Sequence, residues 1–190
     1  MKKMCMLFLM LLPATAWSAG WELDGKASDV NFVSVKKGTV AEVHHFTGLS
    51  GSISSSSAGV AIDLSSVESG ISIRNERMKS MLFDVARFAS ATISADLSNV
   101  NYSELKVGES LTAELPMVLS LHGVKKPVIA DVHIMVLSDR LVVTSRAPVI
   151  VKAADFELEA GIEALRQIAK LSSIVQAVPV SFHLQFIRLR

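Results

Sequence analysis

The chain has 190 residues, of which 50% are hydrophobic and 19% are charged, a length that suits one domain. Its 19 basic and 18 acidic residues give a net charge of +1, and this balance, without any basic run, argues against nucleic-acid binding. The hydrophobic fraction excludes a disordered chain. A single cysteine excludes both an internal disulfide framework and a cysteine-based zinc site.

Residues 1–19 have the pattern of a secretory signal peptide. Two lysines precede an apolar run over 4–12, a proline ends the run, and small residues follow it. The run is shorter than the roughly 20 residues that a membrane-spanning helix needs. We therefore expect an exported protein, periplasmic if the source is a Gram-negative bacterium, with a single domain over 20–190 and no membrane span in the mature chain. The pattern leaves three cleavage positions open, after Ala16, Ser18 or Ala19.

Alternation of apolar and polar residues, which is typical of a strand with one buried face, dominates the rest of the chain. Two strands are expected near the start, over 28–36 and 39–49. Later alternating runs predict strands over 60–64, 93–97, 111–121, 128–136, 141–143 and 180–186. Loops are expected over 54–59 and 99–108 and at Val178–Pro179.

Two segments have helical spacing instead. Over 74–88 the apolar residues recur every three or four positions, at Met78, Met81, Leu82, Val85 and Phe88. Over 159–172 a second apolar stripe contains Ile162, Leu165, Ile168, Ala169 and Leu171. Each segment predicts a short amphipathic helix.

About eight antiparallel strands with two short helices predict a mainly β domain, either a sandwich or a closed barrel. A closed barrel has no exposed edge, and eight strands enclose either a filled core or one small ligand. The inward-facing candidates are mostly aliphatic, and some are as small as Ala95, Ala113 and Ala130. This composition leaves room for an apolar cavity, and it fits a fully packed core as well.

Four segments resemble conserved stretches of a known family. They are Trp21–Asp24 followed by Ser28–Phe32, then Phe46–Ile53, Ile73–Asp84 and Leu119–Val128. On these segments the chain resembles, over 21–190, the YceI-like family of exported polyisoprenoid-binding proteins with a lipocalin-like barrel. The helical insertion over 155–172 is longer than is typical of the family, and a helix at this place can cap or reshape the barrel mouth.

The resemblance implies that a long apolar lipid, a polyisoprenoid or isoprenoid quinone, is held lengthwise inside the barrel without catalysis. Such a protein would serve as a carrier, store or scavenger in the bacterial envelope. The side chains expected to line the pocket are Phe46, Ile62, Leu82, Phe83, Ile93, Met117, Leu119, Val132, Ile134, Phe182 and Leu184. Two alternatives stay open, an envelope interaction protein with a filled barrel and a lipid-modifying enzyme, and so does a homodimer.

Residues that could carry chemistry are sparse. No Gly-x-Ser-x-Gly elbow is present, and the Gly20–Lys26 match to a phosphate-binding loop is followed by Ala27 instead of Ser or Thr. Neighbouring His44 and His45 point to opposite faces of a strand, so at most one joins any given site. One of them can face inward and hydrogen-bond a ligand head group. We expect no metal, no cofactor and no catalytic residues, with His122, His133 and His183 at the surface or the barrel mouth.

Overall fold

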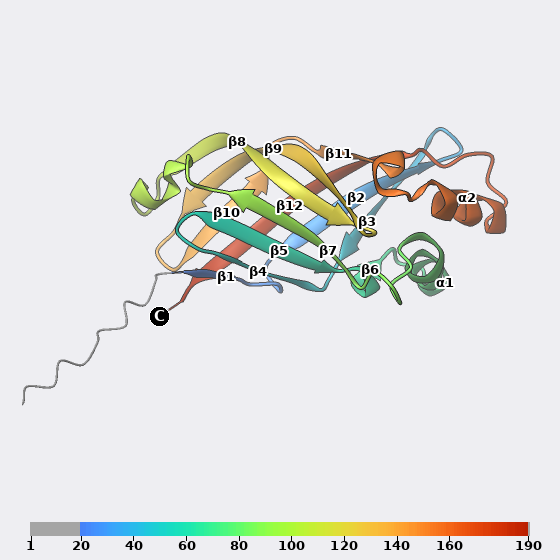
Figure 1. The fold of residues 1–190 in the computed structure, drawn as a ribbon, viewed down its shortest axis with the longest axis horizontal. Coiled ribbons are helices and arrows are strands. Elements are labelled where there is room, and N and C mark those ends of the chain that lie inside the picture. The colour runs from blue at the N-terminus through green and yellow to red at the C-terminus, as the bar shows by residue number, and fades with distance from the viewer. Residues whose placement is uncertain (1–19, 190) are drawn as a thin grey trace, which may run out of the picture.

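The structure is a computed structural model in which residues 20–189 are described; the expected signal peptide, residues 1–19, lies outside them. Twelve strand segments form one antiparallel sheet (Figure 1). They are β1 (Trp21–Leu23), β2 (Asp29–Lys36), β3 (Val40–Phe46), β4 (Leu49–Ile53), β5 (Ser57–Asp63), β6 (Val67–Glu68), β7 (Ser90–Asp96), β8 (Ser110–Leu121), β9 (Val124–Val136), β10 (Arg140–Ser145), β11 (Val149–Lys152) and β12 (Ala177–Arg188).

The twelve segments make eight barrel strands, because four pairs of consecutive segments each continue one strand across a break. Both β1 and β2 pair with β12, β3 pairs with β2 while β4 pairs with β1, and β5 and β6 pair with β4 and β3. Likewise β10 and β11 both pair with β12. The β1–β12 pairing joins the first strand to the last, which closes the sheet. The predicted antiparallel barrel of about eight strands is confirmed.

Strict alternation places the core inside this barrel. Along β9, Ala130, Val132, Ile134 and Val136 are at most 6% exposed, while the residues between them are half-buried. On the same face they lie next to side chains of the neighbouring β8, where Ala113 pairs with Val132. Because successive side chains point to opposite faces of a strand, every second residue is inside and the rest meet solvent.

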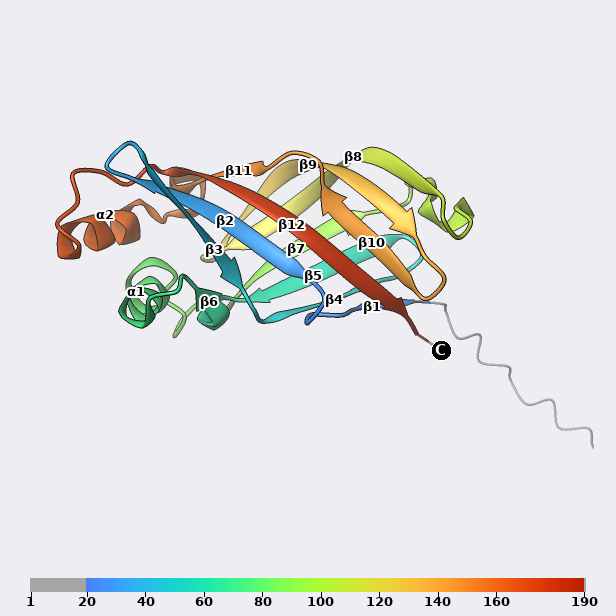
Figure 2. The ribbon, with the colours of Figure 1, turned by 180° about the vertical axis from the view of Figure 1, so that it is seen from behind.

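Two helices lie side by side at one end of the barrel (Figures 1 and 2). Helix α1 (Ser72–Arg77) runs directly into a π-helical turn, Met78–Leu82, and α2 is Glu159–Ile168. Short 3₁₀ segments occupy Leu64–Ser66, Asn101–Glu104 and Ala153–Phe156. No helix within 20–189 combines the length and hydropathy needed to cross a bilayer.

Both predicted helices are real but shorter than expected. The first was expected to reach Phe88, yet it ends at Leu82, because Asp84 takes a left-handed conformation with φ 46°. The N–H of Val85 then donates to the Lys79 carbonyl, which turns the chain away. The second was expected to reach 172 but ends at Ile168, and Lys170 has φ 52°. An apolar stripe does not show which residue will take the left-handed conformation that ends a helix.

Several strand boundaries also differ from the prediction, and β5 begins at Ser57, inside the loop expected over 54–59. The expected strand over 39–49 is broken at Thr47–Gly48, and β4 begins only at Leu49. Val178–Pro179 was expected to be a loop but lies within β12, where Pro179 pairs with Ile150. The pairing of β12 with β2 begins at Val180, so a residue without an N–H is accommodated at Pro179.

Candidate ligand cavity

A cavity of about 200 Å³, here called the inner cavity, lies inside the barrel. All eight barrel strands contribute to its wall, together with Leu82, Phe83, Leu158 and Ile162 from the helical end. Every lining side chain is apolar except that of Tyr102, whose hydroxyl donates to the Ser54 carbonyl at 2.8 Å. The interior therefore provides an apolar surface for an apolar ligand, and it contains almost no polar group that could take part in a reaction.

All the side chains that the sequence placed in a pocket lie in this one wall. They come from six strands and from the π-helical turn with the residue that follows it, and they are Phe46, Ile62, Leu82, Phe83, Ile93, Met117, Leu119, Val132, Ile134, Phe182 and Leu184. Their shared wall is a geometric fact of the fold. Contact of these residues with a ligand stays a prediction.

The cavity exists because short side chains lie next to one another on part of its wall, where larger ones would fill the barrel. Ala58 of β5 pairs directly with Ala95 of β7, and Ala91 lies farther along the same face of β7. All three line the inner cavity. An alanine contributes one methyl group where phenylalanine would contribute a ring, so the volume left between opposite walls is not filled.

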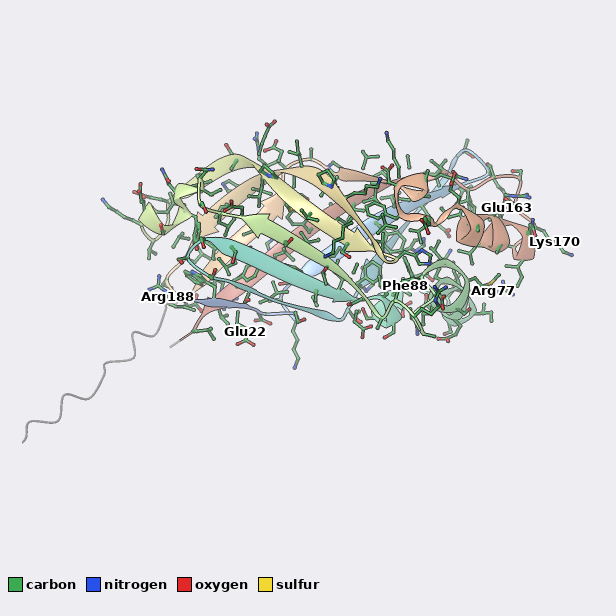
Figure 3. All side chains as sticks on the ribbon, viewed as in Figure 1. Glu22, Arg77, Phe88, Glu163, Lys170 and Arg188 are labelled. Atoms are coloured by element: carbon green, nitrogen blue, oxygen red, sulfur yellow. The ribbon has the colours of Figure 1, made fainter. Side chains whose placement is uncertain are left out.

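A second space, here called the mouth cavity, continues the first toward the helices. It measures about 310 Å³ and is lined by residues of β2, β3, α1 and α2. Four side chains line both spaces: Phe32, Leu82, Ile162 and Val178. In Figure 3, Arg77, Glu163 and Lys170 mark this end of the molecule, and Glu22 and Arg188 mark the opposite end. The two volumes together fall within the range of roughly 300–1,000 Å³ that is typical of small-molecule sites.

Helix α2 covers the mouth through a close contact at a glycine. A Cβ on Gly161 would lie only 2.6 Å from the Met81 carbonyl oxygen and 2.8 Å from the Cα of Leu82. Only glycine lets the two backbones approach this closely. Ile162, the next residue, turns inward and lines both cavities. The insertion over 155–172 thus forms part of the mouth wall.

Helix α1 is held to the barrel by polar contacts. The Arg74 guanidinium donates to Glu42 of β3 at 2.8 Å, and Lys36 forms an ion pair with the same carboxylate at 2.8 Å. The hydrogen bond from Lys36 and the contact with Arg74 lower the pKa of Glu42. Buried Asn75 accepts from the Ser69 N–H and donates to Glu68, both at 2.9 Å. These bonds fix α1 beside the mouth.

The two neighbouring histidines point to opposite sides, as their spacing predicted. His44 is 2% exposed and lines the mouth cavity, whereas His45 is half-buried and lines neither cavity. The Nε2 atom of His44 lies 2.8 Å from the Ser34 hydroxyl, and its ring packs 5.1 Å from that of Phe32. Within residues 20–189 no three His, Cys, Asp or Glu side chains come together as metal ligands would.

Sequence reasoning missed several wall residues. Phe32 is in phase with Val30 on a predicted strand, so alternation could have found it. Leu158 and Ile162 reach the inner cavity only because α2 folds back over the mouth, and no local pattern reports that contact. Tyr102, in a predicted loop, is buried by long-range packing and its hydrogen bond to Ser54.

A family model for the YceI-like domain matches residues 21–186. The chain belongs to the YceI-like domain family. Among solved structures, it is similar to a polyisoprenoid-binding domain from Saccharophagus degradans implicated in plant cell wall breakdown, with 41% identity and a TM-score of 0.85, covering 88% of this chain and 97% of that one. No curated protein matches the sequence.

Two more distant structures share the fold. BcnA of Burkholderia cenocepacia is 17% identical with a TM-score of 0.64, covering 86% of this chain and 98% of its own. The YceI protein of Campylobacter jejuni is 13% identical with a TM-score of 0.51, covering 77% and 84%. The family and its polyisoprenoid-binding neighbour support lipid binding and suggest a binding protein rather than an enzyme.

Proposed function

We propose that this YceI-like protein binds a polyisoprenoid or isoprenoid quinone lengthwise inside its barrel, without catalysis, as a carrier, store or scavenger in the bacterial envelope. The observation that carries the proposal is the inner cavity, whose wall is apolar on all sides. The Saccharophagus degradans domain, 41% identical, binds a polyisoprenoid and supports the same class of ligand here.

The energetics of burial suit such a ligand. Each CH₂ group transferred from water to an apolar wall contributes about 0.8 kcal/mol. About ten such groups give roughly 8 kcal/mol before the costs of association are subtracted. A free energy of that size corresponds to a dissociation constant in the micromolar range. No charged anchor is needed for the chain itself. A cavity with this apolar wall also favours a ligand-binding barrel over the alternative of an interaction protein whose barrel is filled by its own side chains.

Export is part of the proposal. The charged start, apolar run and small residues of 1–19 support a signal peptide that directs the chain to the periplasm. A carrier of membrane lipids needs to work in the aqueous space next to a membrane. Cell fractionation with and without residues 1–19 tests this part, and a cytoplasmic location of the full chain would contradict it.

The ligand is tested by native mass spectrometry on protein purified from its host and on delipidated protein offered prenyl lipids. We expect a retained or newly bound prenyl mass in the wild type. Ala95→Trp, which places an indole in the inner cavity, should reduce bound lipid at least about tenfold, because the ring takes the volume that the chain needs. Ser94→Trp adds the same ring to the exposed face of β7 and should leave uptake unchanged.

Failure of the delipidated wild type to take up any prenyl lipid would contradict the proposal. Equal uptake by Ala95→Trp and wild type would place the lipid outside the inner cavity. Circular dichroism of each variant confirms that the barrel is folded before uptake is compared.

A further inference from the structure

The inward faces of β2 and β3 change from apolar to polar as they approach the helices. Along β2 the in-phase residues are Phe32, Ser34 and Lys36. Along β3, read toward the same end, Phe46 is followed by His44 and then Glu42, and Phe32 pairs with His44. The wall that is purely apolar in the inner cavity thus becomes hydrogen-bonding and charged within two strand positions.

His44 has a polar atom without a partner. Its side chain is 2% exposed, and its Nδ1 is buried without a hydrogen bond to any of residues 20–189. The Ser34 hydroxyl has only the Nε2 of His44 as a partner among the described residues. We assign this hydroxyl as the donor to Nε2, and that assignment leaves the hydrogen of a neutral imidazole on Nδ1. Nδ1–H is then a buried donor that lacks an acceptor, which is costly unless a ligand supplies one.

Burial supports the neutral form of the ring. It lowers the pKa of His44, the Arg74 charge lowers it further, and Glu42 opposes both. At neutral pH the ring therefore offers one N–H and not two. An oxygen placed beside Nδ1 would satisfy this donor.

The mouth cavity also has an excess of positive charge. Its charged lining residues are Lys36, Arg74, Arg77 and Glu42. Glu42 is shared by Lys36 and Arg74, each at 2.8 Å. Arg77, labelled at the helical end in Figure 3, is half-buried on α1. It makes no ion pair or side-chain hydrogen bond with the rest of 20–189. Arg77 and His44 line the same cavity, and a guanidinium and an imidazole N–H that both lack partners suit an anion that carries several oxygens.

We propose that the mouth cavity is a head-group site for a phosphate or diphosphate ester, with His44 and Arg77 donating to its oxygens. This inference rests on the proposed function and narrows it, because it assigns the ligand to the prenyl phosphates in preference to quinones and prenyl alcohols. The chain enters the inner cavity past Phe32 and Leu82, which line both spaces. The barrel wall then supplies affinity, and the mouth supplies the choice of head group.

The test compares ligands with one chain and different heads: geranylgeranyl diphosphate, geranylgeraniol and a quinone with the same prenyl tail. Binding to delipidated full-length protein is measured by calorimetry. We expect the diphosphate to bind about tenfold or more tightly than the alcohol or the quinone, since charged hydrogen bonds are stronger than neutral ones. Added salt should weaken binding of the diphosphate and leave binding of the alcohol unchanged.

Arg77→Gln should weaken diphosphate binding about tenfold and leave the alcohol unchanged, because only the anion uses the guanidinium. His44→Phe keeps a ring against Phe32 and should weaken the diphosphate as well. The matched control is Arg87→Gln, which removes the same charge from a side chain that is 73% exposed and lines neither cavity. If His44→Phe does not fold, Arg77→Gln alone decides the outcome.

Equal affinity for all three heads, unchanged in Arg77→Gln, would overturn the head-group site and leave polyisoprenoid binding intact. Inorganic diphosphate, which has no prenyl chain, tests the head-group site independently of polyisoprenoid binding. Its binding to the wild type, weakened in Arg77→Gln, would support the site even if no prenyl chain bound. Absence of binding by both diphosphate and geranylgeranyl diphosphate would overturn the site.

Discussion

The inner cavity and the mouth cavity adjoin each other, share four side chains, and differ sharply in chemistry. The inner wall has no charged residue, while the mouth has three cations, one carboxylate and a buried imidazole. Burial of an apolar chain is roughly proportional to area and has no direction. Hydrogen bonds and charges act at fixed positions and discriminate between partners. One barrel thus separates a region suited to affinity from a region suited to selection.

The largest test of this contrast is a charge placed deep in the barrel. Val132 is 0% exposed, and no cation lines the inner cavity. Val132→Asp should lower the free energy of unfolding by more than about 4 kcal/mol, since an unpaired buried charge is among the most damaging changes. Urea denaturation measures the loss, provided the variant folds at all.

Ile129→Asp is the control on the same strand. Ile129 is 64% exposed and points outward, so the same carboxylate there should change stability by no more than about 0.5 kcal/mol. A Val132→Asp variant that unfolds at the urea concentration of the wild type would mean that water or a cation reaches the inner cavity. The contrast between the two regions would then fail.

The burial of Val132 could be predicted from the sequence because it depends on local alternation alone. The same reasoning placed the nine strand residues of the predicted wall on one surface, Leu82 and Phe83 were placed there from the predicted helix, and closure of the sheet brought them together. The mouth was harder to predict. Its wall depends on the left-handed turn at Asp84 and on the contact of Gly161 with Met81, which joins segments distant in sequence.

The change from apolar to polar residues along the inward faces of β2 and β3 is visible in the sequence, but sequence reasoning did not identify it as a site. Ser34 and Lys36 are in phase with Phe32, and Glu42 is in phase with His44. Read alone, such a series looks like a strand end that emerges into solvent. Only the helices that cover it turn these residues into the wall of a cavity.

The second prediction concerns the helix that covers the mouth. Gly161→Leu forces α2 away from the π-helical turn, because a Cβ there meets the Met81 carbonyl. We expect a loss of about 1–3 kcal/mol in stability, typical of overpacking. We also expect faster release of bound lipid, measured by transfer to acceptor vesicles. Ala160→Leu, one residue earlier on the exposed side of α2, should do neither.

Slower or unchanged release in Gly161→Leu would mean that the lipid does not leave past α2. The lipid would then have to leave the barrel through an opening other than the mouth beside α2. A large loss of stability in Ala160→Leu would show that the effect reports helix propensity or exposure and not the close contact.

The smallest expected effect is a pH dependence that arises from the mouth alone. Burial lowers the pKa of His44, so the unfolded chain, where the histidine has an ordinary pKa near 6.5, binds its proton more readily than the folded one. The contribution of neutral His44 to the free energy of unfolding should therefore be fully present above about pH 6.5. It should decrease as the pH falls toward the pKa of His44 in the folded protein. The slope for one proton cannot exceed about 1.4 kcal/mol per pH unit.

The charged groups around His44 do not obscure this titration. The carboxylate closest to His44 along the same face of β3 is that of Glu42, whose lowered pKa keeps it ionised through this range. The unfolding free energy of wild type and His44→Phe, measured from pH 5 to 8 without ligand, gives the difference directly, since the other histidines contribute to both. A curve for His44→Phe parallel to that of the wild type would show that the folded protein accepts a charged imidazole at the mouth. Nδ1 would then not be the neutral donor on which the head-group site depends.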